Sequence, residues 1–262
     1  MIERFSQMPS ALRTQARWQQ VAGRFGAIPV MLAHPNWTTS APVMLWMHGR
    51  TVNKELDPGR YLRWIRAGIA ACAIDLPGHG ERLDPASHED ANSWDVMRQM
   101  VDEIDDIVEA LREMKVFDMQ RMGIGGMSAG GMATLARLCR PHTFICTSVE
   151  ATTGSWNHQR HTGMFRGRSD TEIASLNPMA NLDRWRKIPL QAFHSRLDQR
   201  VSFEGQSAFI DELQRRYADP SLIDFVVYDR TGVPDEHSGF GLFASEAKDR
   251  QAAFLKQWLG TS

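Results

Sequence analysis

The sequence predicts an α/β fold, in which a mainly parallel central sheet carries helices on both faces. Two short runs, residues 42–47 and 69–74, are continuously apolar, which is typical of parallel strands that are covered on both faces. Between such runs lie amphipathic segments, of which residues 94–114 have the clearest three-and-four spacing of apolar side chains. Strands and helices that alternate in this way are joined by right-handed crossovers and form one parallel sheet.

Length and composition indicate one globular domain that spans residues 1–262. Hydrophobic residues make up 42% of the chain and charged residues 23%, which is enough for a sizeable core and argues against disorder. The formal net charge is −1, and the 30 basic and 31 acidic residues are spread along the chain. This balance indicates neither a nucleic-acid footprint nor a polybasic membrane surface. We therefore expect the partner to be a small molecule.

The cysteines and the N-terminus predict a cytoplasmic protein. Cys72, Cys139 and Cys146 are odd in number and show no pairing pattern, which favours reduced thiols. The N-terminus lacks the apolar region of a signal peptide. No apolar run approaches the roughly 20 residues that a membrane span needs.

The first part of the chain is expected to cover and edge the sheet. Residues 1–20 predict a short helix on the outside of the domain, with a buried side formed by Leu12, Ala16 and Trp18. Residues 25–33 and the turn that follows them predict a strand or hairpin at the sheet edge.

A helix should follow the strand at 42–47. Asp57 is suited to its N-cap and Pro58 to its first position, and Gly68 is a stop signal before the next strand. The amphipathic helix at 94–114 should turn its acids to solvent, and this face consists of Asp102, Glu103, Asp105, Asp106 and Glu109.

The second half of the chain continues the alternation with one interruption. Its expected strands are residues 143–149, 188–193 and 222–228, and its expected helices are 203–217 and 243–259. Residues 151–186 are too long for a plain crossover and mix aromatic with polar residues, so we expect a small lid over the carboxyl edge of the sheet.

The glycine-rich stretch at 122–131 contains Gly126-x-Ser128-x-Gly130, the pattern of a nucleophile elbow. In an elbow the serine lies on a tight strand-to-helix turn, and the residues two before and two after it are small because strand and helix come close. The context fits, because an apolar run ends in these glycines and residues 132–138 can continue as a helix. The pattern also occurs by chance in glycine-rich turns, so the rest of the chain has to decide.

A reactive serine needs a histidine that accepts its proton and a carboxylate that holds the histidine in the right tautomer. Asp198 lies in the loop after one predicted strand, and His237 lies in the loop after the last one. Ser128, Asp198 and His237 therefore reach the same edge of the sheet, in the chain order serine, acid, histidine. Glu150 is the rival acid, because it follows the strand after the elbow.

Several motifs share this edge: His48-Gly49, the Asp75 to Arg82 loop, the elbow, the His194 to Val201 segment and Glu236-His237. As a set, over about residues 25–260, they resemble the α/β-hydrolase superfamily, and in it the small bacterial carboxylesterases of the dienelactone-hydrolase and prolyl-oligopeptidase-like branch. In that branch the acid lies in an H-x-x-x-D-x-x-V segment, which favours Asp198 over Glu150. The resemblance implies a serine hydrolase that cleaves esters and needs no cofactor.

An oxyanion hole needs two backbone N–H groups that point at the developing negative charge. We expect these from Ala129, directly after the nucleophile, and from Arg50, in the loop after His48-Gly49. An apolar residue is usual at the position of Arg50 in this branch. The Arg50 side chain either binds an anionic part of the substrate or points to solvent, as exposed arginines generally do.

Other residues at this edge carry weaker signals. Met127, beside the nucleophile, and Trp156, in the lid segment, are candidates for substrate binding, although Trp156 could equally be ordinary packing. His158 and His161 have the spacing of two metal ligands, but no cysteine or carboxylate completes a recognisable site, so we expect no metal.

The function expected from these residues is hydrolysis of carboxylic esters with small or medium acyl groups through an acyl-enzyme. The same triad would serve a thioesterase or a small-peptide hydrolase, and we favour esters because no large substrate-selecting domain precedes the catalytic residues. A non-catalytic binding protein with this fold is the alternative of another class, but it would usually lack a triad member.

Overall fold

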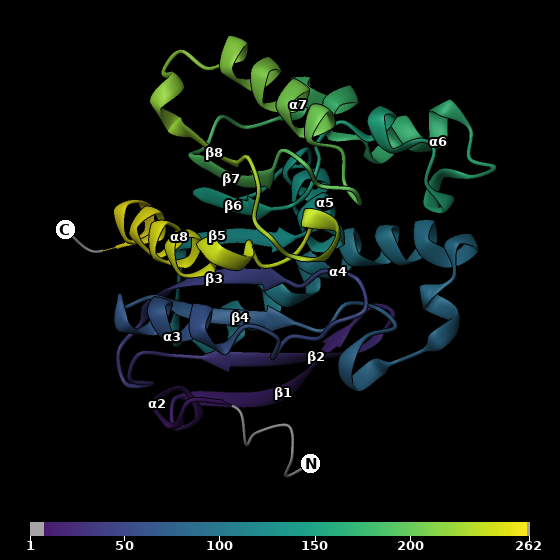
Figure 1. Ribbon diagram of the computed structural model, residues 1–262. Coiled ribbons are helices and arrows are strands. Elements are labelled where there is room, and N and C mark those ends of the chain that lie inside the picture. Colours follow the sequence, from purple (N-terminus) through teal and green to yellow (C-terminus); the bar gives the residue numbers. More distant parts are fainter. Residues whose placement is uncertain (1–7, 261–262) are drawn as a thin grey trace.

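The computed structural model describes residues 8–260 and has one eight-stranded sheet as its centre (Figure 1). The order across the sheet is β1-β2-β4-β3-β5-β6-β7-β8. The strands are β1 (Ala16–Gly23), β2 (Gly26–Ala33), β3 (Ala41–Met47), β4 (Ala70–Ile74), β5 (Phe117–Met127), β6 (Cys146–Glu150), β7 (Leu190–Ser195) and β8 (Ile223–Tyr228). From β4 to β8 all neighbours pair in parallel, whereas β2 pairs antiparallel with both β1 and β4. The prediction of a mainly parallel sheet is confirmed.

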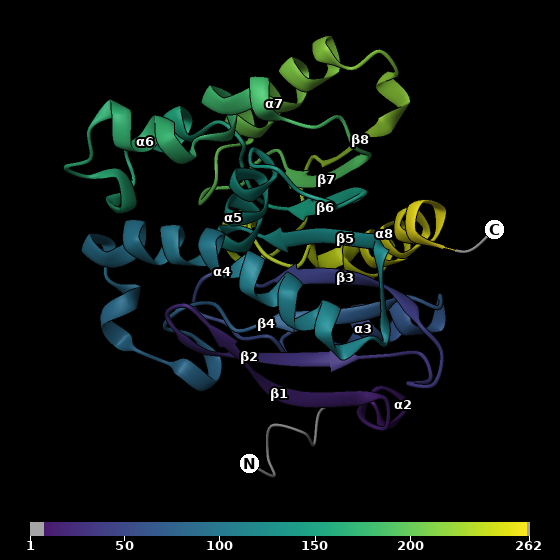
Figure 2. The same ribbon diagram turned by 180° about the vertical axis from the view of Figure 1, so that it is seen from behind.

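Helices cover both faces of this sheet, as the sequence predicts. Figure 1 shows α3 (Pro58–Arg66) and α8 (Ala244–Leu259) in front of the sheet, and Figure 2 shows α4 (Ser93–Met114) and α5 (Ala129–Leu138) on the opposite face. The helix α7 (Phe203–Arg216) packs in the same hydrophobic cluster as α4 and α5. The sheet therefore forms the middle of three layers.

The apolar run of β3 shows why a doubly covered strand has no polar side. Val43, Leu45 and Met47 pack in the cluster that contains α4, α5 and α7. Met44 and Trp46 point the other way and pack with α3 and α8. Successive side chains of a strand alternate between faces, and here each face has a helical layer to cover it.

The helix predicted near the N-terminus is wrong except for a single helical turn. The helix α2 covers only Ser10–Arg13, and Ala16 and Trp18 belong to the strand β1. This strand pairs with β2 along its whole length, from Ala16 with Ala33 to Gly23 with Gly26. Pairing with a neighbouring strand has overridden the weak helical pattern. The part of the prediction that concerns residues 1–7 lies outside the described residues.

One residue of the expected acidic face of α4 is also placed differently. Glu103 is 3% exposed, and its carboxylate accepts two hydrogen bonds from Arg82, at 2.8 and 2.6 Å. Because Arg82 comes from the loop after β4, this ion pair fastens that loop to α4. The burial of Glu103 is explained by Arg82, because a carboxylate is almost never buried without a charged partner.

The segment expected to form a lid consists of the helix α6 (Asp170–Leu176) and 3₁₀ turns at Trp156–Gln159, Gly163–Phe165 and Pro178–Arg184. Figures 1 and 2 show α6 standing out from the body of the fold. The base of the segment packs in the core, because Trp156, Phe165 and Leu182 are buried there. Its function as a lid stays a prediction.

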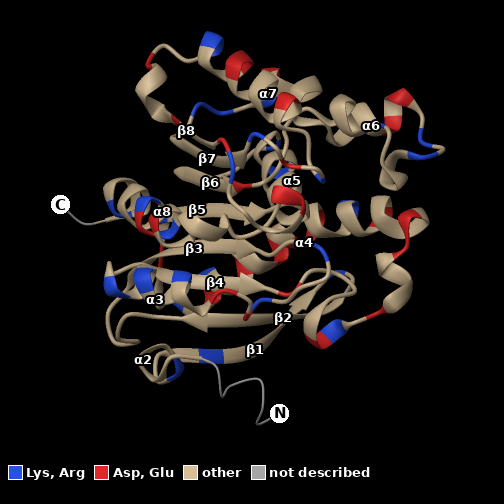
Figure 3. Cartoon of the chain, viewed as in Figure 1, with Lys and Arg blue, Asp and Glu red and all other residues tan. Residues whose placement is uncertain are grey.

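The formal net charge of −1 is reflected in how the charged side chains are distributed. Figure 3 shows acidic and basic residues on the same helices and loops, so neither sign dominates the face in view. Among residues 8–260, no helix is long and apolar enough to cross a membrane.

Candidate active site

The nucleophile elbow has the geometry that its glycines indicate. Ser128 joins the end of β5 to the start of α5 with φ 52° and ψ −117°, a strained conformation for a residue with a side chain. A Cβ at Gly126 would lie 2.5 Å from the backbone carbon of Gly130, and a Cβ at Gly130 would lie 2.4 Å from the carbonyl oxygen of Met47. Only glycine fits at these two positions, because the obstacles are backbone atoms.

Neighbouring strands hold the strained serine in place. Its N–H donates to the carbonyl oxygen of Glu150 at 2.8 Å, and its own carbonyl oxygen accepts from the Thr152 hydroxyl at 2.9 Å. Both partners belong to β6 or to the residues directly after it. The elbow is therefore fixed from the side as well as along the chain.

His237 and Asp198 meet Ser128 at this edge of the sheet. The Nε2 atom of His237 lies 2.9 Å from the Ser128 Oγ, and its Nδ1 atom lies 2.8 and 3.0 Å from the two carboxylate oxygens of Asp198. Asp198 follows β7, and His237 follows the 3₁₀ turn at Pro234–Glu236 after β8. Because Nδ1 donates to the carboxylate, Nε2 is left as an acceptor for the serine hydroxyl.

The Asp198 carboxylate is buried, with 0% of its side chain exposed. Burial alone would raise its pKa, but hydrogen bonds from His194, His237 and the backbone of Val201 outweigh that effect and lower the pKa to about 2. The N–H groups of Arg200 and Val201 donate to Oδ1 at 2.8 and 2.9 Å. The acid is therefore ionised at neutral pH and held in one orientation.

His194 contacts the acid but is not among the site residues that the sequence predicts. Its Nε2 atom lies 3.1 Å from the carbonyl oxygen of Val201 and 3.4 Å from the Oδ2 of Asp198. A carbonyl oxygen only accepts, so Nε2 carries the hydrogen and presents it to both oxygens. The signal that could have found it is its place four residues before the acid, at the end of a buried strand.

Glu150, the rival acid, is engaged elsewhere. Its carboxylate accepts two hydrogen bonds from Arg60, at 2.5 and 2.8 Å, and one from Gln251 at 3.3 Å. Arg60 is in α3 and Gln251 is in α8, so the Glu150 side chain is committed to that face of the sheet. Asp198, and not Glu150, contacts His237.

The loop after β3, which carries Arg50, lies directly against the nucleophile. A Cβ at Gly49 would be 3.4 Å from the Ser128 Cβ. Within residues 8–260, the N–H of Arg50 has no hydrogen-bond acceptor, and the N–H of Ala129 is at the first position of a helix, where no acceptor within the helix exists. Both predicted oxyanion donors are therefore free to bind a ligand, and their role stays a prediction.

His48 ties this loop to the loop after β4. Its Nδ1 atom is 2.6 Å from the Gly49 carbonyl oxygen, and its Nε2 atom accepts from the N–H of Leu76 at 3.1 Å. Burial lowers the pKa of His48 to about 4, with nearby His79 and Lys54 acting in the same direction. The ring is thus a neutral link, with the hydrogen on Nδ1.

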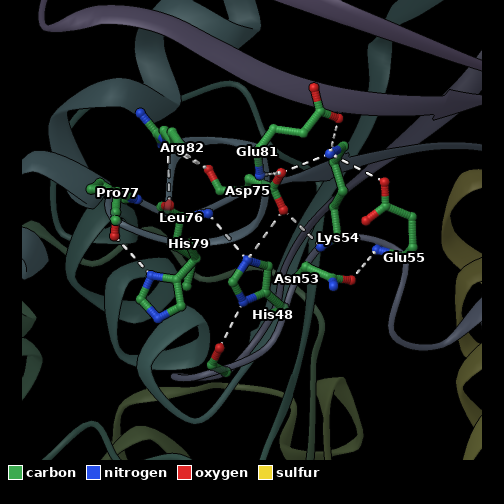
Figure 4. Close-up of polar contacts among 12 residues, drawn as sticks. His48, Asn53, Lys54, Glu55, Asp75, Leu76, Pro77, His79, Glu81 and Arg82 are labelled. Carbon is green, nitrogen blue, oxygen red and sulfur yellow. Dashed lines mark hydrogen bonds and ion pairs between the residues drawn. The ribbon is translucent and has the colours of Figure 1, made fainter. Parts of the chain in front are cut away.

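Behind His48 lies a buried ionic cluster, which Figure 4 shows in close-up. The Nζ atom of Lys54, with 0% of its side chain exposed, donates to Asp75 and Glu81 at 2.6 Å each and lies 3.2 Å from Glu55. Burial alone would lower the pKa of Lys54, but the hydrogen bonds to Asp75 and Glu81 outweigh it and raise the pKa. The cluster fastens the loops after β3 and β4 to each other.

The remaining predicted residues lie around this centre. The Arg50 guanidinium donates to the carbonyl oxygen of His88 and lies 3.8 Å from Asp90, and 44% of the side chain is exposed. Met127 is partly buried beside Gly49. Trp156 is 0% exposed and packs against Trp94, so its predicted contact with substrate would need a change in packing.

His158, the first of the two histidines with the spacing of metal ligands, lies in the 3₁₀ turn at Trp156–Gln159, and His161 follows that turn. Nδ1 of His158 lies 3.0 Å from the Ser155 hydroxyl. Among residues 8–260, no group of three or more histidine, cysteine, aspartate or glutamate side chains is arranged to hold a metal ion.

Comparison with known proteins places this site in a family. Esterase YjfP of Escherichia coli (strain K12) is 27% identical over 124 residues, which are 46% of this chain and 50% of YjfP, so the match spans half of that relative. The Pyrococcus furiosus esterase Pf2001 superposes with a TM-score of 0.70 at 18% identity and covers 97% of both chains. A puromycin-hydrolyzing peptidase of Mycobacterium tuberculosis gives a TM-score of 0.76 at 17% identity, over 98% of this chain and 41% of the peptidase.

The superpositions confirm the predicted α/β-hydrolase fold over nearly the whole chain. The model of the prolyl oligopeptidase family matches residues 60–262, a range that contains Ser128, Asp198 and His237 and well over half of the sequence. The chain therefore belongs to the prolyl oligopeptidase family.

Proposed function

We propose that the protein is a serine hydrolase that cleaves carboxylic esters with small or medium acyl groups. The single observation that carries the proposal is the continuous hydrogen-bonded line from the Ser128 hydroxyl through His237 to the Asp198 carboxylate. A serine on a strained elbow, a histidine with its acceptor nitrogen toward that serine, and a buried ionised carboxylate are the parts that acyl transfer needs.

In the first step, the Ser128 Oγ attacks the ester carbonyl carbon while His237 Nε2 accepts the hydroxyl proton. The imidazolium that forms is stabilised by Asp198, whose lowered pKa keeps it ionised. His237 then gives the proton to the departing alcohol, which leaves an acyl-enzyme. In the second step His237 activates a water molecule in the same way, and the acid is released.

The N–H groups of Ala129 and Arg50 serve as the oxyanion hole in this scheme. The support for this role is that the Gly49 backbone lies against Ser128 and that the Arg50 N–H has no acceptor within the described part of the chain. Loss of one such donor typically costs about a hundredfold or more in rate. The neutral His48 ring bonds the Gly49 carbonyl oxygen and the Leu76 N–H, and it thereby holds this loop against the loop after β4.

Esters are favoured over peptides by the pattern of similarity. Pf2001, named an esterase, is matched over 97% of its chain, whereas the puromycin-hydrolyzing peptidase is matched over only 41% of its own. The peptidase therefore shares the hydrolase fold with this protein, but more than half of the peptidase chain has no counterpart in the match. A thioester or a short peptide is the alternative substrate for the same three residues.

The test is a set of matched substrates that share one acyl group and differ in the leaving atom: a p-nitrophenyl ester, an acyl thioester and an aminoacyl anilide. The proposal predicts the highest kcat/KM on the oxygen ester and a maximum at short or medium acyl chains when the ester series is extended. A dominant rate on the anilide would instead make the protein a peptidase, and a dominant rate on the thioester would make it a thioesterase.

A further inference from the structure

The two residues before His237 have a conformation that needs an explanation. Asp235 has φ 54° and Glu236 has φ 51°, so two consecutive residues with side chains lie in the left-handed region. Each such residue is strained, and the strain persists only where the surroundings fix it. Glycine would relieve the strain here, but the sequence has an aspartate and a glutamate.

The Glu236 carboxylate supplies the fixing contacts. The residue is 9% exposed. Its Oε2 atom accepts from the Ser195 hydroxyl at 3.0 Å, from the Thr231 hydroxyl at 2.7 Å and from the Thr231 N–H at 2.5 Å, and its Oε1 atom accepts from the Gly232 N–H at 2.7 Å. Within residues 8–260, no lysine, arginine or histidine forms an ion pair with this carboxylate.

The four donors come from two different loops. Thr231 and Gly232 lie in the segment that carries His237, whereas Ser195 ends β7 and leads into the loop that carries Asp198. A further backbone hydrogen bond, from the Gln199 N–H to the Asp235 carbonyl oxygen at 2.9 Å, joins the same two loops. The Glu236 side chain is therefore a tie between the segment of the base and the segment of the acid.

Neutral N–H and O–H groups hold the charge of this carboxylate. Burial alone would raise the pKa of Glu236, but the donors from Thr231, Gly232 and Ser195 lower it to about 2. The carboxylate therefore stays ionised, and the tie stays complete, across the pH range in which a histidine base works.

We propose that Glu236 is a positioning residue that fixes His237 between Asp198 and Ser128 by clamping the strained backbone from which the imidazole projects. Glu236 does not touch the substrate in this proposal, and it acts only through His237. The proposal rests on the proposed function, because it assigns Glu236 a part in keeping the 2.9 Å contact between His237 Nε2 and Ser128 Oγ.

The experiment compares three variants with the wild type: Glu236→Gln, Glu236→Asp and the control Glu113→Gln, which changes an exposed glutamate of α4. In Glu236→Gln an NH₂ group, which can only donate, replaces one oxygen that now accepts hydrogen bonds, and the negative charge is lost. In Glu236→Asp the charge stays, but the carboxylate is withdrawn by one methylene. Each variant is assayed for kcat and KM on a p-nitrophenyl ester and for its thermal midpoint.

Positioning predicts that kcat falls about tenfold to a hundredfold in both Glu236 variants, because small misplacements of a catalytic group cost that much. KM should stay within about twofold, since Glu236 does not contact the substrate. Glu236→Asp keeps the negative charge, so a loss of kcat in this variant reports the placement of the carboxylate.

Two results would overturn the proposal. One is wild-type kcat in folded Glu236→Asp, since only the charge and not the placement would then matter. The other is a loss in either variant that follows the thermal midpoint and disappears at lower temperature, since the residue would then be purely structural. If the Glu236 variants do not fold, the milder change Thr231→Val serves instead. It removes one hydroxyl donor, keeps the carboxylate, and should lower kcat by a smaller factor.

Failure of the proposed function has a different signature. In that case the wild type and Glu113→Gln would show no turnover above that of Ser128→Ala, and both proposals would fall together. Normal turnover in the wild type with unchanged Glu236 variants would overturn the positioning role alone.

Discussion

Replacement of Asp198 by asparagine should abolish most of the activity while leaving the fold in place. The shapes of the two side chains are almost the same, so the effect comes from one atom. The Asp198 Oδ1 accepts from the N–H groups of Arg200 and Val201, at 2.8 and 2.9 Å. An asparagine must keep its oxygen there, because an amide nitrogen would face two other donors.

That orientation turns the new NH₂ group toward His237, where Oδ2 now lies 2.8 Å from Nδ1. A donor at this place makes Nδ1 the acceptor and forces the imidazole hydrogen onto Nε2. The Nε2 atom, 2.9 Å from the Ser128 Oγ, then cannot accept the serine proton. The wrong tautomer in a Ser-His-Asp triad costs about 10⁴ in kcat, which corresponds to about 5 kcal/mol of transition-state stabilisation.

The assay is kcat and KM on a p-nitrophenyl ester for the wild type and Asp198→Asn at neutral pH, with circular dichroism to show that both are folded. We expect a drop of at least about a thousandfold in kcat with KM little changed. If folded Asp198→Asn keeps more than about a tenth of the wild-type kcat, Asp198 does not set the tautomer of His237 and another group does.

Three further changes test the elbow, the buried cluster and the acid. Gly130→Ala should destabilise the protein by about 1–3 kcal/mol and remove activity, because its Cβ would meet the Met47 carbonyl oxygen at 2.4 Å; urea unfolding and an ester assay check this. Lys54→Met should destabilise the protein by about 3–5 kcal/mol in urea unfolding, because it leaves the buried Asp75 carboxylate without its cation. The pKa of Asp198 is lowered from 3.8 to about 2, so its carboxylate stabilises the fold above pH 3.8 and loses this effect as the pH falls toward 2. The stability gap between wild type and Asp198→Asn should therefore narrow by about 1 kcal/mol from pH 5 to pH 3.

Matched controls separate these effects from general damage. Gly59→Ala, whose nearest obstacle lies 3.5 Å away, should be tolerated in α3. Lys256→Met changes an exposed lysine of α8 and should alter stability by less than about 0.5 kcal/mol. An equal loss in Gly130→Ala and Gly59→Ala, or in Lys54→Met and Lys256→Met, would contradict the structural reasons given.

The regular elements could be predicted because their causes are local. The helix α3 begins at Pro58 after Asp57, and the chain turns at Gly68 with φ 81°, where a positive φ suits glycine. Asp57 occupies the N-cap position without a side-chain capping bond, so Pro58 and the glycine after the helix are enough to set its two ends. The buried face of α4 follows directly from its three-and-four spacing.

Features that depend on a distant partner could not be predicted. In β1 only Val21 is buried, and the sequence does not alternate between apolar and polar residues as that of a half-buried strand does. The strand forms because it pairs with β2. Glu103 resembles the other acids of α4, and only the arrival of Arg82 from another loop explains its burial.

The same distinction applies to the site. Ser128, Asp198 and His237 could be picked out because each follows a strand at one edge of a parallel sheet, and the topology brings such positions together. The contacts of Glu236 and His194 depend on how two loops cross, which no local pattern encodes. The position of Trp156 in the segment predicts substrate binding, but its depth in the core depends on packing, which the sequence does not show.

In the proposed mechanism Ser128 is the nucleophile, and covalent labelling is the measurement that shows this without a substrate. Wild type and Ser128→Ala are each treated with an organophosphonate ester probe, digested and analysed by mass spectrometry. We expect one labelled peptide in the wild type, with the phosphonate on Ser128, and no label in folded Ser128→Ala. Equal labelling of both proteins, or a label on another residue, would contradict it.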